Sequence, residues 1–353
     1  MEKRSAPSSS FTSAMSLTLK GLDHVPGHYV LPLSHRPNHT SSETPLRLPI
    51  IDLSCLHQPS LRPLVIDKVR TACKQLGFFQ VVGHGIPPSV ITEAIEAATD
   101  FFDMPIEEKM HLESSNVHNP VRYGTSMNHV KDKVYFWRDF IKHYSHPLQT
   151  WINQWPSNPP SYKEKMGNYA KAAHMLQNQL IELVFESLGL NPKYLHEDIE
   201  AGAQVLAVNC YPACPEPDLV LGMPPHSDYG SLTILLQSRE GLEIMDQDKK
   251  WHHVPVLPGS LIIQLGDQME VISNGHYKST IHRATVNMEK RRISIASLHS
   301  LGLNKKVGPA MELVDEQHPM SYSEGSFNGF LHYISGNDIM EKSYIETLKK
   351  NPY

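Results

Sequence analysis

Apolar positions recur at helical spacing in three segments of the first half of the chain. A stripe over residues 61–76 stops at Gly77, and Pro88 is suited to the first turn of a helix over 88–102. The longest segment covers 161–188, where apolar residues lie three and four apart: Met166, Tyr169, Ala173, Leu176, Leu180, Leu183 and Val184. We therefore expect three helices, the longest of them packed against a sheet.

The pattern changes after Ala203 into short β-branched and apolar runs separated by Pro and Gly. Strands are expected at 205–211, 232–237, 242–245, 260–265, 271–273 and 292–298, in addition to 48–53, 78–82 and 137–144. The dipeptide Asn274-Gly275 is typical of a hairpin turn. Many short strands with regular turns favour a sandwich or a barrel.

Composition narrows the class of protein. A chain of 353 residues can bury a sizeable core, and its net charge of −5 argues against binding nucleic acid through phosphates. No apolar run approaches the roughly 20 residues of a membrane span, and the four cysteines form no C-x-x-C pair. We expect a cytoplasmic monomer that binds a small molecule. A nuclear location and a transit peptide in the Ser-rich, basic first 20 residues are the alternatives.

The candidate chemistry centres on His226 and Asp228. Residues i and i+2 of a strand point to one face, so an extended segment aims both side chains at one point. Two histidines and one carboxylate around a metal with open positions are typical of non-haem Fe(II) oxygenases. The second histidine is His276 or His282; both follow the Asn274-Gly275 turn with the same strand parity, so periodicity does not choose between them.

Two further i, i+2 pairs suit a bound dicarboxylate. Arg292 offers a guanidinium that grips a carboxylate with two hydrogen bonds, and Ser294 adds a hydroxyl. Asn209 and Tyr211 form a similar pair upstream. A metal with open positions and such a clamp together indicate a site for a keto acid with two carboxylates.

The chain resembles the plant 2-oxoglutarate- and Fe(II)-dependent dioxygenases. The resemblance covers roughly residues 48–300 and is carried, in the family's order, by LPIID (48–52), LGFFQVVGHGI (76–86), WRD (137–139), NCYPACP (209–215), HSDYGSLT (226–233), SNGHYKS (273–279), HR (282–283) and RIS (292–294). The stretches WPSNP (155–159), GDQM (266–269) and ELVDE (312–316) are similar to the downy-mildew-resistance branch, which includes salicylate hydroxylases and soluble flavone synthases.

The resemblance implies a mainly β fold with helical attachments. It implies a flexible arm at 1–47, an N-terminal α/β region with the long support helix at 48–200, and a jelly-roll core, a double-stranded β-helix, at 201–305. A helical cap at 306–353 follows, with a helix over 321–340 that closes the barrel mouth.

The same resemblance implies the ligands and the reaction. It assigns Fe(II) to His226, Asp228 and His282, and 2-oxoglutarate to Arg292, Ser294, Tyr211 and Asn209, with O2 as cosubstrate and ascorbate as reductant. A carboxylate at Asp228, where related halogenases have a small residue, favours hydroxylation or desaturation. Asp267 is expected to fix a turn.

Resemblance also suggests where the organic substrate binds. Residues near pocket positions of the relatives are Tyr123, Phe136, Phe140, Leu298 and Phe330. The expected reaction is hydroxylation, desaturation or demethylation of a phenolic, flavonoid, alkaloid or hormone, with succinate and CO2 as coproducts. Two alternatives are an oxidase with the same metal ligands that does not use 2-oxoglutarate, and a non-catalytic binding protein on the same barrel.

Overall fold

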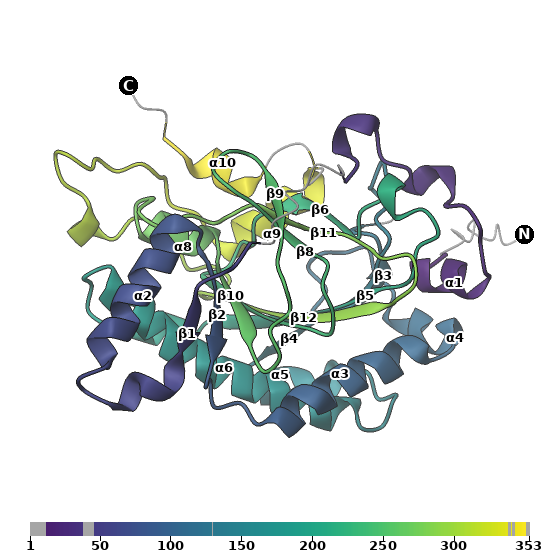
Figure 1. Cartoon of the computed structure of the whole chain (residues 1–353), viewed down its shortest axis with the longest axis horizontal. Coiled ribbons are helices and arrows are strands. Elements are labelled where there is room, and N and C mark those ends of the chain that lie inside the picture. The colour runs from purple at the N-terminus through teal and green to yellow at the C-terminus, as the bar shows by residue number, and fades with distance from the viewer. Residues whose placement is uncertain (1–11, 38–45, 129, 338–339, 341–342, 351–353) are drawn as a thin grey trace, which may run out of the picture.

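The computed structural model describes residues 12–37, 46–128, 130–337, 340 and 343–350 (Figure 1). The Ser-rich N-terminus considered as a transit peptide lies mostly outside these residues. The helices are α1 (Ala14–Leu19), α2 (Arg62–Gln75), α3 (Pro88–Asp103), α4 (Ile106–Lys109), α5 (Leu148–Trp151), α6 (Tyr162–Ser187), α7 (His196–Glu200), α8 (Asp267–Ile272), α9 (Phe327–Gly336) and α10 (Tyr344–Leu348). In the described part of the chain, no helix is both long and apolar enough to span a membrane.

The strands form two sheets. They are β1 (Ile50–Asp52), β2 (Phe78–Val82), β3 (Val121–Thr125), β4 (Asp139–His146), β5 (Ala203–Tyr211), β6 (Met223–His226), β7 (Leu232–Gln237), β8 (Leu242–Met245), β9 (Trp251–His253), β10 (Leu261–Leu265), β11 (His282–Ala284) and β12 (Arg292–Ser300). The larger sheet has the order β1-β2-β10-β7-β12-β5-β4-β3 and the smaller one β6-β11-β8-β9. The expected jelly-roll core is therefore present, and strands from residues 50–146 extend its larger sheet.

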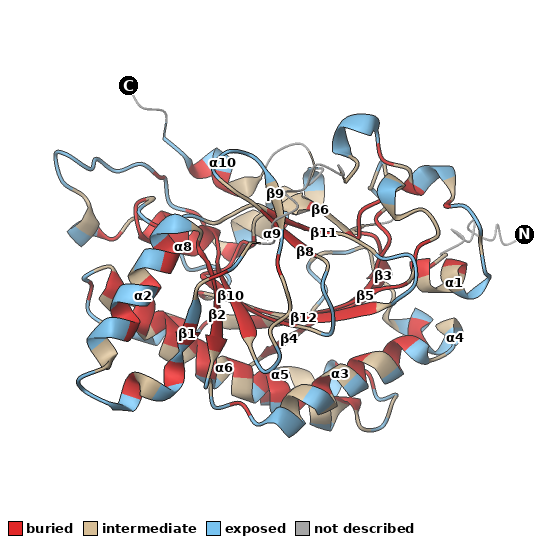
Figure 2. Ribbon diagram, in the orientation of Figure 1, coloured by how far each residue is buried: buried red, intermediate tan, exposed pale blue. Residues whose placement is uncertain are grey.

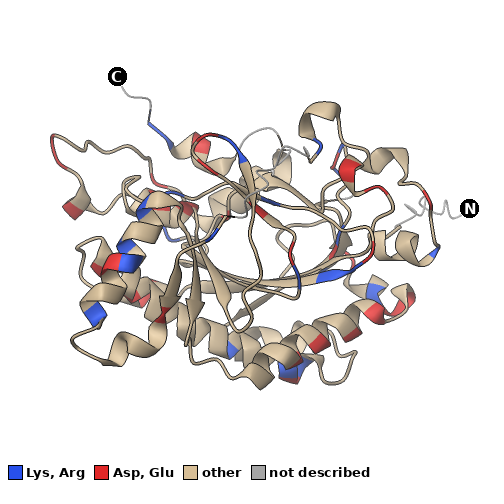
Figure 3. Ribbon diagram, viewed as in Figure 1, with Lys and Arg blue, Asp and Glu red and all other residues tan. Residues whose placement is uncertain are grey.

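The helices cover the outer face of the larger sheet. In Figure 1, α3 and α6 run beneath the strands and α2 stands at one end, and Figure 2 shows buried residues on the sides of these helices that face the sheet. All seven stripe residues predicted on the long helix are buried, from Met166 to Val184. The prediction that α6 forms part of the core is confirmed. Acidic and basic residues are interspersed over the described part of the chain (Figure 3).

The N-terminal segment differs from the expected flexible arm. Within 12–37, Ala14, Leu17 and Tyr29 are buried against Trp137. The backbone N–H groups of Ala14 and Met15 donate to the buried Asp139 carboxylate at 2.9 and 3.1 Å. Apolar burial and these two bonds hold the segment against the barrel, which its polar composition did not indicate.

The strand and the hairpin expected around Asn274 are also wrong. Residues 267–272 form helix α8, whose residues are all buried, so the β-branched Val271 and Ile272 pack inside a helix. Asn274 and Gly275 follow the helix with φ of 51° and 82°, the left-handed conformation that commonly ends helices. The Asn274 side chain then bonds to the backbone of residues 313, 318, 319 and 321, which ties the C-terminal region to the barrel.

Candidate active site

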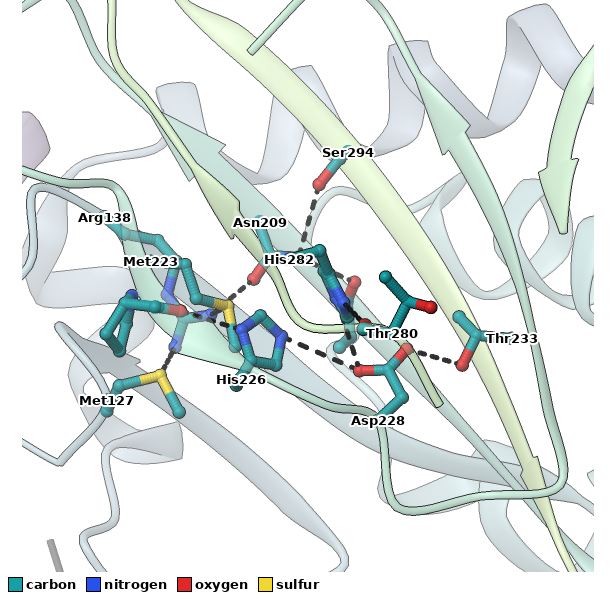
Figure 4. A network of polar contacts seen from close by, with 12 residues as sticks. Met127, Arg138, Asn209, Met223, His226, Asp228, Thr233, Thr280, His282 and Ser294 are labelled. Atoms are coloured by element: carbon teal, nitrogen blue, oxygen red, sulfur yellow. Dashed lines mark hydrogen bonds and ion pairs between the residues drawn. The ribbon is translucent and has the colours of Figure 1, made fainter. Parts of the chain in front are cut away.

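Two neighbouring strands of the smaller sheet bring the three predicted metal ligands together. His226 ends β6, Asp228 lies in the loop that follows, and His282 begins β11 as the antiparallel partner of His226. Their potential ligand atoms all lie within 4.8 Å of one another (Figure 4). His276 lies elsewhere, exposed beside His318. The geometry thus separates the two histidines that periodicity left open.

Backbone carbonyls fix how both imidazoles point. Nδ1 of His226 lies 2.8 Å from the Pro224 carbonyl, and Nδ1 of His282 lies 3.1 Å from the Thr280 carbonyl. Because a carbonyl only accepts, each Nδ1 carries the proton and each Nε2 keeps its lone pair. Both Nε2 atoms face Asp228 Oδ1, at 3.7 and 3.8 Å. Such outer hydrogen bonds orient metal-binding histidines.

The carboxylate of Asp228 is oriented in the same way. The Thr233 hydroxyl donates to Oδ2 at 2.7 Å, which leaves Oδ1 facing the two imidazoles. Burial, and after it the neighbouring His282, lowers the pKa of His226 to about 3, so this ring is neutral near pH 7. Two imidazoles oriented through Nδ1 and one carboxylate, all nearly buried, fit a divalent iron ion.

Close backbone packing holds the loop that carries Asp228. A Cβ on Gly266 would lie 2.1 Å from the Gly230 carbonyl oxygen, so only glycine fits there. The N–H of Asp267 donates to the Asp228 carbonyl at 2.8 Å. Asp267 thus begins helix α8 and anchors the ligand loop, and burial raises the pKa of its side chain to about 7.

Arg292 presents a buried donor to the cavity. Its Nε donates to the Arg239 carbonyl at 3.1 Å and its Nη2 to Gln237 Oε1 at 2.8 Å. Nη1 is buried and has no hydrogen-bond partner within the described residues. The guanidinium lies over the Tyr211 ring, 4.9 Å from its centroid. An unsatisfied buried cationic donor beside a cavity fits a carboxylate ligand.

The other residues of the predicted clamp lie on β12 itself and on the adjoining strand β5. Ser294 on β12 is the antiparallel partner of Asn209 on β5, and Asn209 Nδ2 donates to the Ser294 hydroxyl at 3.3 Å. Asn209 Oδ1 in turn accepts from Arg138 Nη1 at 3.1 Å, and Figure 4 shows this chain of contacts leading towards the metal ligands. Arg138 thereby sets the orientation of Asn209.

A cavity of about 650 Å³ connects these groups with an apolar wall. Phe140, Leu298 and Phe330 line it, and Phe330 belongs to α9 in the region where the cap helix was expected. Tyr123 and Phe136 do not line it. Tyr123 packs in the main core and Phe136 packs with Leu31 and Leu221, so both predictions of substrate contact are corrected.

Comparison with known proteins identifies the family. The family model of the 2OG-Fe(II) oxygenase superfamily matches residues 202–300, and that of the N-terminal region of non-haem dioxygenases in morphine synthesis matches 48–158. Flavanone 3-dioxygenase 3 of Oryza sativa is 44% identical over 86% of this chain and 94% of its own. The chain belongs to the 2-oxoglutarate- and Fe(II)-dependent oxygenases. The oxygenase is therefore an oxidoreductase that uses Fe(II), 2-oxoglutarate and O2, with ascorbate as the usual reductant.

Two further relatives agree with the resemblance found in the sequence. Protein DOWNY MILDEW RESISTANCE 6 of Arabidopsis thaliana is 35% identical to the oxygenase over 96% of this chain and all of its own. The crystal structure of JOX2 in complex with 2OG, Fe and JA has a TM-score of 0.85 and 30% identity, and covers 97% of this chain and 98% of its own.

Several polar groups of the site were not singled out from the sequence. Thr233 and Arg138 lie within recognised stretches, but only the folded contacts give them a part in orienting Asp228 and Asn209. Arg122 and Lys142, which also line the cavity, lie on neighbouring strands. The apolar residues on both sides of Arg122 were the available signal on β3, whereas β4 shows no such alternation around Lys142.

Proposed function

We propose that His226, Asp228 and His282 hold the iron of this oxygenase, and that Arg292 with Ser294 binds the far carboxylate of 2-oxoglutarate. The single observation that carries the assignment is the convergence of two carbonyl-oriented imidazoles on Asp228 Oδ1 at 3.7 and 3.8 Å. The unsatisfied Nη1 of Arg292 supports the cosubstrate site. Tyr211 lies against the guanidinium, and Asn209 bonds to Ser294.

The protein's own contribution is orientation, charge and exclusion of water. The carbonyls of Pro224 and Thr280 keep both histidines in the tautomer that binds metal, and Thr233 leaves one Asp228 oxygen for the ion. Iron and 2-oxoglutarate together supply the oxidising power, with succinate and CO2 as coproducts. Burial of the site keeps reactive chemistry away from bulk water.

We propose a small plant metabolite as the substrate: a phenolic, a flavonoid, an alkaloid or a hormone. The supporting observation is the cavity wall of Phe140, Leu298 and Phe330 beside the metal ligands. Names of similar proteins include flavanone dioxygenases, a dioxygenase for auxin oxidation and jasmonate-induced oxygenases. Hydroxylation is the reaction that we assign first, with desaturation and demethylation as the other outcomes of the same chemistry.

The test measures succinate released in the presence of Fe(II), ascorbate and 2-oxoglutarate for a panel of such compounds. We expect substrate-dependent succinate that is lost in His282→Ala and retained in His276→Ala, the matched control on the rival histidine. Oxidised product without succinate would instead support an oxidase that does not use 2-oxoglutarate. Ligand binding with no turnover of any compound would support a binding protein.

We also propose a cytoplasmic monomer. The net charge of −5 and the mixed surface charge in the described residues suit a soluble, non-associating protein. One relative, 2-oxoglutarate-dependent dioxygenase 21 of Oryza sativa, carries the word chloroplastic in its name. A fluorescent fusion to the complete chain, compared with one that lacks residues 1–20, distinguishes cytoplasm from plastid.

A further inference from the structure

Two cations of the cavity wall, Arg122 and Lys142, have no ion-pair partner within the described residues and take no part in the proposed 2-oxoglutarate clamp. Arg283 pairs with Glu243 at 2.5 Å, and Arg138 donates to the Ser126 carbonyl and to Asn209. Arg122 and Lys142 line the same cavity, and neither lies within 4.0 Å of a carboxylate oxygen in the described part of the chain. Both charges are therefore available to a ligand.

These two cations are direct neighbours across the sheet. Arg122 on β3 is the antiparallel partner of Lys142 on β4. Like charges placed directly opposite each other destabilise a sheet. A pair of this kind on the wall of a binding cavity lowers stability unless an anion compensates it.

The strand register places small side chains next to the two cations on the cavity wall. Lys142 pairs with Ala207 on β5, which pairs with Ala296 on β12, so small side chains follow the two cations along one row of the cavity wall. The next row contains Phe140, Asn209 and Ser294, the region assigned above to 2-oxoglutarate. The cations thus belong to a different row from the cosubstrate clamp.

Burial and neighbouring positive charges disfavour the charged forms of both side chains, and so lower their pKa values. Burial, followed by the fields of Arg122 and Arg138, lowers the pKa of Lys142 to about 7. Burial and the field of Arg138 lower the pKa of Arg122 to about 10. An anion beside both groups would reverse these effects, since an opposite charge favours the charged form of each.

Arg122 is also held in place for binding. Its Nε donates to the Ser114 carbonyl at 3.1 Å, and its guanidinium carbon lies 5.4 Å from the centroid of the Phe140 ring. No hydrogen bond from Nη1 or Nη2 is formed within the described residues. A fixed guanidinium with two free nitrogens matches the two oxygens of a carboxylate.

We propose that Arg122 and Lys142 bind a carboxylate group of the organic substrate, so that the oxygenase acts on an apolar carboxylic acid. This inference rests on the proposed function, because it names the substrate class of the same cavity. Lys142 supplies a point charge and Arg122 a planar fork. The apolar wall of Phe140, Leu298 and Phe330 accommodates the rest of the molecule.

The test compares acids with their neutral carboxamides of the same shape. Phenylacetate, cinnamate and indole-3-acetate, each beside its amide, are titrated into the protein loaded with Mn(II) and 2-oxoglutarate, and the rise in Tm is recorded. We expect at least one acid to bind about 10- to 100-fold more tightly than its amide. Lys142→Met should remove that preference, and Lys142→Arg should retain most of it.

Controls separate charge from folding. Lys171→Met makes the same change at an exposed position on α6 and should keep the preference. Without ligand, Lys142→Met should have a Tm equal to or above that of the wild type, because it removes the repulsion from Arg122. A variant with lowered Tm would contradict the idea that the pair destabilises the free protein.

Two results would overturn the proposal. One is equal binding of acids and amides by the wild type. The other is a Lys142→Met variant that binds acids normally but needs more 2-oxoglutarate, which would assign Lys142 to the cosubstrate. Turnover of acids and amides alike would leave the oxygenase function standing, whereas acid binding without any succinate would reject that function and keep the anion site.

Discussion

At the scale of single residues, the site depends on donors that the fold leaves without partners. Arg292 uses Nε and Nη2 within the protein and keeps Nη1 buried and unsatisfied. An unmet buried donor costs about 1–3 kcal/mol in the free protein. A ligand carboxylate accepts a hydrogen bond from this donor and so recovers the energy on binding. The clamp is therefore selective for carboxylates because its donor is unsatisfied in the free enzyme.

The unsatisfied Nη1 of Arg292 predicts the effect of replacing this residue by lysine. Lysine keeps the charge but loses the planar fork, so the two-point contact with a carboxylate becomes a single one. We expect the apparent KM for 2-oxoglutarate to rise about 10- to 100-fold, with the affinity for the organic substrate nearly unchanged.

The matched control for that variant is Arg291→Lys. Arg291 is the preceding residue and pairs with Asp103 outside the cavity. Its replacement should leave the KM for 2-oxoglutarate within a factor of two or so of the wild type, as expected for a surface pair. Equal KM values for both variants would show that the guanidinium of Arg292 does not hold the cosubstrate.

Residue-scale prediction from the sequence worked where two side chains lie two positions apart in an extended segment, on a strand or just after it. His226 with Asp228, and Arg292 with Ser294, are separated by two positions, and the structure brings each pair to one cavity. It was wrong for Tyr123, which points away from the cavity that the adjacent Arg122 lines. Parity along one strand is visible in a sequence, whereas the choice of face depends on pairing with other strands.

At the scale of elements, a buried carboxylate joins the N-terminal segment to the barrel. Asp139 begins β4 and accepts hydrogen bonds from the first N–H groups of α1. Free N–H groups at the start of a helix favour a negative charge, and a helix of six residues needs such support. The contact therefore adds to the apolar burial that holds residues 12–37 against Trp137.

We predict that Asp139→Asn loosens this segment. The amide loses the charge and one acceptor oxygen, so unfolding should become easier by about 1–3 kcal/mol in urea titrations. Limited proteolysis within residues 12–37 should speed up before the barrel itself is cut. Asp100→Asn on the exposed side of α3 is the control and should change neither measurement appreciably. Unchanged cleavage in Asp139→Asn would contradict the anchoring role.

Element-scale prediction succeeded for long periodic segments and failed for short ones. The stripe on α6 has seven apolar positions spread over about five helical turns, whereas residues 271–273 offered three positions next to a turn dipeptide. Helix α8 is buried on every side, so it shows no polar face that would reveal its period. The same left-handed pair, Asn274 and Gly275, ends a helix as readily as it closes a hairpin.

At the scale of the whole molecule, the fold buries several histidines in neutral form. His143 on β4 lies against Trp155 with its ring centroid 4.0 Å away, and its Nε2 lies 3.0 Å from the Tyr162 hydroxyl. Burial lowers the pKa of His143 to about 3 and that of His174 to about 4. The pKa of His299 is lowered as well, chiefly by burial. These rings lie where α6 packs against the sheet. Protonating them would therefore weaken the packing of the two layers.

The consequence is a loss of stability in acid. Below the unfolded pKa of about 6.5, the unfolded chain binds a proton at His143 and the folded chain does not, so the free energy of unfolding falls as pH decreases towards 3. For His143 alone the loss between pH 7 and pH 5 is about 2 kcal/mol. Urea titrations of metal-free protein at the two pH values measure the total change in the free energy of unfolding. His143→Gln should reduce this pH-dependent change by that amount, whether or not the variant is itself less stable. An equal pH difference in variant and wild type would mean that His143 is not held neutral by the folded layers.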